Sequence, residues 1–125
     1  MGDNSYLRDG NVFIEAQHIG AAAPILSAAD LYVAGIDTNG NITSIDFDGR
    51  DIGDDEEIAR ALAPYVRDGS YMELCDDMGY LWRWVFDGEG CTSVDAIVLW
   101  PKPDAPKDIK QQIQKVFEQH LMPEQ

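Results

Sequence analysis

Three β-prone segments in the second half of the chain are joined by short connectors that each end in glycine. The segments cover residues 70–76, 80–87 and 91–100, and the three-residue connectors end at Gly79 and Gly90. Three-residue hairpin loops commonly hold a glycine in the left-handed conformation beside the following strand. The connectors therefore predict two successive hairpins, which make residues 70–100 a three-stranded antiparallel meander.

The loop lengths also predict the register of this meander. Arg83 is placed opposite both Glu73 and Asp95, so we expect these three residues to form a structural charge cluster; an anion anchor is the alternative role for the arginine. The other face should be the aromatic core face. It contains Tyr80, Trp82, Trp84 and Phe86, with Leu74 and Ala96 beside Trp82 and with Met72 and Val94 beside Trp84. A slip of one residue would reverse every side chain, so the register is a strict test.

An earlier hairpin is predicted from residues 31–37 and 42–48, which flank Asn39-Gly40. Asn-Gly is the strongest two-residue turn signal because both residues tolerate positive φ. A two-residue turn at this position gives three predicted pairs: Ile36 with Thr43, Ala34 with Ile45, and Tyr32 with Phe47.

Two segments have the apolar spacing of helices. Residues 54–66 begin with four acids, which suit the positive end of a helix, and Pro64 should end or kink this helix early. A second helix should begin near Pro106 and pack on the aromatic face of the sheet. Its apolar stripe consists of Ile109, Ile113, Val116, Phe117 and Leu121.

The remaining segments complete one domain of 125 residues. We expect a loose lead-in over residues 1–10, a strand over 11–19 with Val12, Ile14 and Ala16 on one side, and a frayed end over 122–125. Residues 20–30 fit either a loop or a short helix broken at Pro24. The predicted fold class is α+β, with an antiparallel sheet of five or six strands and two principal helices.

The charge of the chain limits the kind of partner that it can bind. The formal net charge is −14, and residues 37–79 contain twelve acids against three bases, which gives −9 in that stretch alone. Such a field repels nucleic acid and anionic membranes and attracts basic surfaces. Because 45% of the residues are hydrophobic, the charge belongs to a folded body rather than to a disordered tail.

Location and redox state follow from what the sequence lacks. It shows no secretory leader and no apolar run near the roughly 20 residues that a membrane helix needs. Cys75 and Cys91 fall on the two outer strands of the predicted meander, roughly 9–10 Å apart laterally. A disulfide needs Cα atoms within about 7 Å. We therefore expect a cytoplasmic protein with two free thiols.

The sequence gives little indication of a catalytic or metal-binding site. The histidines, His18 and His120, belong to no catalytic or metal-binding motif. The loop that starts at Asp37 has Ile42 where a calcium-binding loop requires glycine. Acids from Asp46 to Asp55 could gather a hard cation, but no spacing fixes a coordination shell. We expect a protein that is not an enzyme and has no cofactor or metal.

The densest group of acids is the predicted partner-binding surface. Seven acids lie within twelve residues: Asp46, Asp48, Asp51, Asp54, Asp55, Glu56 and Glu57. The predicted partner is a basic protein surface. In one version, the chain is an inhibitor or immunity-type protein whose carboxylates imitate nucleic-acid phosphates and block a nucleic-acid-binding protein. Two alternatives remain: a carboxylate-rich metal-dependent domain, or an accessory subunit or homo-oligomer that associates through the outer sheet face (Leu81, Val85, Ile97 and Leu99).

Overall fold

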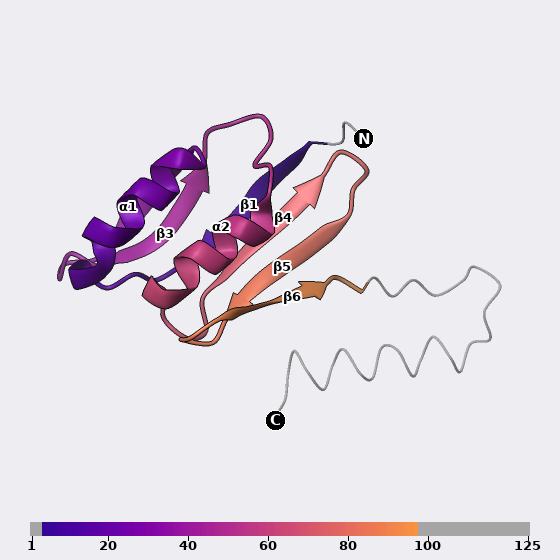
Figure 1. Ribbon diagram of the computed structural model, residues 1–125. Helices are drawn as coiled ribbons and strands as arrows, with labels where there is room; N and C mark the ends of the chain where they lie inside the picture. Colours follow the sequence, from indigo (N-terminus) through magenta and orange to yellow (C-terminus); the bar gives the residue numbers. More distant parts are fainter. Residues whose placement is uncertain (1–3, 98–125) are drawn as a thin grey trace, which may run out of the picture.

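The computed structural model describes residues 4–97, and these form an α+β fold with one six-stranded antiparallel sheet. The sheet order is β2-β3-β1-β4-β5-β6, and both helices lie on the same face of the sheet (Figure 1). The elements are β1 (Ser5–Asn11), α1 (Ile19–Ala28), β2 (Leu31–Ile36), β3 (Ile42–Phe47), α2 (Asp55–Leu62), β4 (Tyr71–Asp76), β5 (Leu81–Phe86) and β6 (Cys91–Asp95). The fold class and the antiparallel sheet are as predicted.

The first strand is the largest departure from the sequence prediction. Residues 5–10 were expected to be a loose lead-in, but they belong to β1, which lies in the middle of the sheet between β3 and β4. The prediction of a strand over residues 11–19 is also wrong. Beyond Asn11 the chain makes only an isolated bridge from Ile14 to Ile42 before a 3-10 turn, Ala16–His18, leads into α1.

Two features of β1 explain why the sequence pattern does not predict this strand. A β-bulge between Leu7 and Asp9 interrupts the alternation of apolar and polar residues. Gly10 then packs against Ile45 of β3. A Cβ at position 10 would collide with the carbonyl oxygen of Ile45 and lie 2.6 Å from its Cγ1. Glycine is therefore required by the close approach of the two strands.

The core lies between the two helices and the sheet. Helix α1 continues through Pro24 and buries Ala22 and Leu26. Helix α2 ends at Leu62 and tightens into a 3-10 turn at Ala63–Tyr65, as predicted from Pro64. The largest fully buried side chains are Val12, Ile14, Ile42, Leu62, Met72, Leu74 and Phe86. None of the helices within residues 4–97 has the length and apolar character needed to cross a membrane.

The predicted pairing of β4 with β5 is confirmed. Glu73 pairs with Arg83, while Leu74 and Met72 pair with Trp82 and Trp84, respectively. Gly79 has a φ of 91°, and its amide donates to the carbonyl of Asp76, which closes the expected three-residue loop.

The predicted pairing of β5 with β6 is wrong by one residue. Val94 lies opposite Arg83, and Asp95 lies opposite Trp82. The cause is a shorter loop, because the amide of Asp87 donates to the carbonyl of Gly90 (3.1 Å) and leaves only two residues in the turn. The carboxylate of Asp87 accepts from the amides of Glu89 and Gly90, which holds this turn closed.

The predicted β2–β3 pairing is also wrong, in this case because the loop is longer than predicted. The loop has three residues rather than two, because the amide of Asp37 donates to the carbonyl of Asn41. The carboxylate of Asp37 accepts from the amides of Asn39 and Asn41, and Gly40 alone takes a positive φ, 84°. The observed pairs are Leu31 with Phe47, Tyr32 with Asp46, Val33 with Ile45, Gly35 with Ser44, and Ile36 with Ile42.

Helix α2 contacts the aromatic face of β5. Trp84 and Phe86 are buried there, whereas Tyr80, which was also predicted on the core face, is in the loop before β5 and is 68% exposed. The C-terminal helix predicted to pack on this face lies outside the described residues, as does the predicted frayed end at 122–125.

Candidate functional site

Asp55, one of the seven acids predicted to bind a partner, is a structural residue. Its Oδ2 accepts hydrogen bonds from the indole N–H groups of Trp82 (2.9 Å) and Trp84 (2.6 Å). The carboxylate is half-buried. It therefore ties the first turn of α2 to strand β5, and its Oδ2 already accepts from two donors.

Three more of the seven acids have local structural partners. Asp54 caps α2 by accepting from the amide of Glu57. Asp51 accepts from the amides of Ser5 and Gly53, which holds the loop before α2 against the start of β1. Glu56 pairs with the guanidinium of Arg60 at 2.9 Å, one helical turn later; both side chains of this pair are more than half exposed.

Asp46 and Asp48 lie at the end of β3, beside the exposed ring of Tyr32. The hydroxyl of Tyr32 donates to Asp46 Oδ2 (3.3 Å). The negative charge of Asp46 is the main cause that raises the pKa of the Tyr32 phenol; its desolvation, the hydrogen bond and the charge of Asp48 add to the effect. Both carboxylates are exposed to solvent.

Acids among the seven border at least two different hollows. Asp48 borders a hollow beside the end of α1 and the start of β2. Asp54 and Glu57 border a different hollow, between α1 and α2. Within residues 4–97, the side chains of Asp48 and Glu57 have no hydrogen-bond or ion-pair partner, so these two acids are the most available to a basic partner.

The hollow between α1 and α2, which we name the helix groove, has a volume of about 480 Å³. Its apolar lining consists of Pro24, Ile25, Ala28, Ala29, Ile52, Ile58 and Ala61. The acids at its border are Asp54 and Glu57. An apolar floor beside carboxylates can hold an apolar side chain while a neighbouring cation meets the acids. The sequence prediction missed this groove because residues 20–30 were not assigned to a helix.

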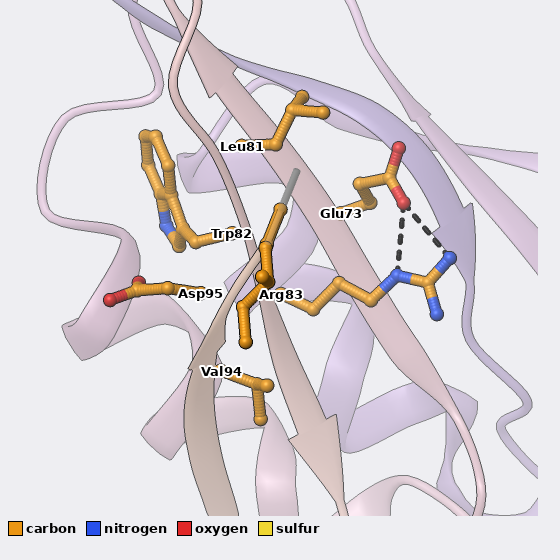
Figure 2. Close-up of a pocket in the computed structure, with 8 residues that line it drawn as sticks. Glu73, Leu81, Trp82, Arg83, Val94 and Asp95 are labelled. Carbon is orange, nitrogen blue, oxygen red and sulfur yellow. Dashed lines mark hydrogen bonds and ion pairs between the residues drawn. The ribbon is translucent and has the colours of Figure 1, made fainter. Parts of the chain in front are cut away.

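The predicted charge cluster on the meander is confirmed only in part. The Nε and Nη2 atoms of Arg83 each lie 2.9 Å from Glu73 Oε1, and Arg8 Nε lies 3.6 Å from the same carboxylate. Figure 2 shows Arg83 extending toward Glu73, while Asp95 lies beside Trp82 instead. The cluster is therefore Arg8, Glu73 and Arg83, and the last two of these residues border a hollow of about 320 Å³.

Both cysteines are free thiols, as the sequence predicted. Strand β5 lies between Cys75 on β4 and Cys91 on β6. Burial is the main cause that raises the pKa of the Cys91 thiol, and the guanidinium of Arg60 partly offsets it. Within the part of the chain that the structure describes, no group of three or more His, Cys, Asp or Glu side chains is placed to hold a metal ion.

The described body carries most of the charge of the chain. Residues 4–97 contain eighteen acidic and five basic side chains, a formal net charge of −13. Several acids close loops by accepting backbone N–H groups, as at Asp37, Asp76 and Asp87. Comparison with known protein families, with curated proteins and with solved structures finds no match to this chain.

Proposed function

We propose that this chain is a non-enzymatic acidic protein that binds a basic protein surface, and that the helix groove is where the partner docks. The observation that carries the proposal is the apolar groove between α1 and α2, bordered by Asp54 and by the unpartnered Glu57. An apolar side chain of the partner would enter the groove. Lysine or arginine residues beside that side chain would face the acids at the border.

The two parts of this surface would act on different steps of binding. The net charge of −13 on residues 4–97 attracts a cationic partner from a distance and raises the association rate. Salt weakens this attraction over a Debye length of about 8 Å. A side chain buried in the groove would instead slow dissociation, because desolvated apolar anchors dominate most interfaces.

A nucleic-acid-binding protein is the partner class that best fits this charge. Such proteins present clusters of lysine and arginine to phosphates. The exposed carboxylates at Asp48, Asp51 and Glu57 could occupy the same cationic sites. In that case, the chain would act as an inhibitor or immunity-type protein, and nucleic acid would compete with it for the partner.

The test uses a basic partner captured from source lysate at low salt and then purified. Replacing Ala61 with arginine places a cation and a bulky side chain at the exposed border of the groove. We expect this variant to bind at least about tenfold more weakly, equivalent to about 1.4 kcal/mol, mainly through faster dissociation. Glu57→Gln should slow association severalfold and reduce its salt dependence. Surface plasmon resonance at two salt concentrations measures both rates.

Glu89→Gln is the matched control, because it removes one exposed charge at the β5–β6 loop, which does not border the helix groove. We expect it to change the association rate much less than Glu57→Gln. Equal effects of the two glutamine variants, together with unchanged binding of Ala61→Arg, would exclude the helix groove. If no basic protein is captured at low salt, the proposed function itself is wrong.

A further inference from the structure

Strand β2 is one edge of the sheet, and no described strand pairs with its outer side. Its six residues, Leu31–Ile36, include neither a proline nor a charged side chain, which are two usual protections of a free edge. Tyr32, Val33 and Ile36 are 48%, 38% and 61% exposed. This strand, which we name the β2 edge, is therefore open to pairing with a further strand.

The backbone of the β2 edge directs hydrogen-bonding groups outward. The amide of Asp48 donates to the carbonyl of Asp30, so the next pair along the two strands, Leu31 with Phe47, is a non-hydrogen-bonded pair. By the same alternation, the N–H and C=O groups of Val33, like those of Leu31, face away from β3. The register shifts just after Val33, so an added strand should be short and centred on these two residues.

The two sides of the β2 edge differ in chemistry. On the side of the helices, Leu31 is buried, and the exposed Val33 lies opposite the buried Ile45. On the other side, Tyr32 lies opposite Asp46 and donates to its carboxylate at 3.3 Å. Both of these side chains are exposed. A strand added here would therefore meet an apolar surface on one side and a negative charge on the other.

A hollow of about 380 Å³ lies beside the start of the β2 edge. Helix α1 contributes Ala23, Leu26 and Ser27 to its lining. The exposed acids Asp30 and Asp48 also border it. Partly apolar walls beside carboxylates suit a lysine or arginine side chain, which packs its methylene stem and leaves its cation near the acids. The helix groove is separate, because other residues of α1 line it.

We propose that the β2 edge binds an extended cationic segment of another protein, which adds to the sheet as a further strand. Backbone hydrogen bonds to Leu31 and Val33 would supply affinity, and alternate side chains would supply specificity. Apolar side chains would face the helix side, and lysine or arginine would face Asp46. A second copy of the described body would bring another −13 to this edge and would be repelled. The inference goes beyond the proposed function, because it concerns a different surface and does not require binding at the helix groove.

The probe is a capped, fluorescent peptide of alternating valine and lysine, which matches the two sides of the β2 edge. Fluorescence anisotropy at low salt would measure its affinity for the full-length chain. Val33→Lys should weaken binding at least about tenfold, because it places a cation on the edge where the strand adds. Val94→Lys is the matched control, since it makes the same change at an exposed position on β6, the opposite edge strand. It should change the affinity much less, as should Ala61→Arg at the helix groove.

N-methylation of the peptide separates strand addition from simple charge attraction, because it removes N–H donors and keeps the lysine charges. Alternate residues of an extended strand direct their N–H groups to opposite edges. Methylating the valines should abolish binding of an antiparallel strand, and methylating the lysines should abolish binding of a parallel one. In either case, the other set of methyl groups should be tolerated.

Four results would overturn the proposal. They are a peptide that does not bind at low salt, equal losses from the two methylation sets, equal losses from Val33→Lys and Val94→Lys, and a loss with Ala61→Arg as large as that with Val33→Lys. Dimers of the chain that are seen by light scattering and dissociated by Val33→Lys would overturn it in favour of a second copy. Because the probe is a synthetic peptide, the result does not depend on capturing a partner for the helix groove.

Discussion

Replacing Asp55 with alanine is expected to lower the free energy of unfolding by about 2–3 kcal/mol. The substitution removes one carboxylate that accepts from two indole N–H groups, at 2.9 and 2.6 Å, and leaves both donors without that acceptor in a partly buried site. Asp55→Asn should cost less, because its amide oxygen can still accept. Urea denaturation followed by tryptophan fluorescence would measure the change.

Glu57→Ala is the control, since it removes an exposed acid from the same helix turn that makes no indole contact within residues 4–97. It should change stability by no more than about 0.5 kcal/mol. A loss in Asp55→Ala no greater than in Glu57→Ala would show that the paired indole bonds do not hold α2 to β5.

Replacing Gly10 with alanine should cost at least about 2 kcal/mol, while Gly20→Ala should stabilise the protein by about 0.5–1 kcal/mol. At position 10, the new Cβ would collide with the backbone of Ile45 in the neighbouring strand. At position 20, in the first turn of α1, nothing lies within 4 Å of the added atom. Alanine also suits a helix better than glycine.

The same chemical change at both positions makes this pair informative. Each alanine lowers the entropy of the unfolded chain by a similar amount, so the difference between the variants reports the native structure. Thermal and urea unfolding would be compared with the original protein. Equal stabilities for the two variants would mean that β1 and β3 separate enough to accept a methyl group at position 10.

The position of glycine was not sufficient to predict the register of every hairpin. At the β4–β5 loop, Gly79 occupies the left-handed position and the predicted pairing is observed. An aspartate accepts backbone N–H groups in all three hairpin loops, at Asp37, Asp76 and Asp87, but the loops after Asp37 and Asp87 are one residue longer and one residue shorter than predicted. Aspartate close to a turn is therefore part of the turn signal, and the identity of the glycine is not sufficient.

The candidate site was less predictable than the fold because it depends on contacts between distant segments. The two indoles that bind Asp55 follow it by 27 and 29 residues, and helical patterning gives no information about them. The helix groove likewise needs α1, whose small residues and internal Pro24 give a weak helical signal. Acid density alone could indicate the sign of a partner's charge, but not which acids are free to meet it.

The central position of β1 has a consequence for synthesis of the chain. β1 leaves the ribosome before both of its neighbours, because β3 is complete only at Phe47 and β4 only at Asp76. Throughout that interval, one edge of β1 is a template for mispairing with other nascent chains. The bulge after Leu7 and the exposed charges of Arg8 and Asp9 make it a poor template. The same bulge that made β1 hard to predict from the sequence, together with these charges, would therefore limit mispairing of β1 until β4 has been synthesised.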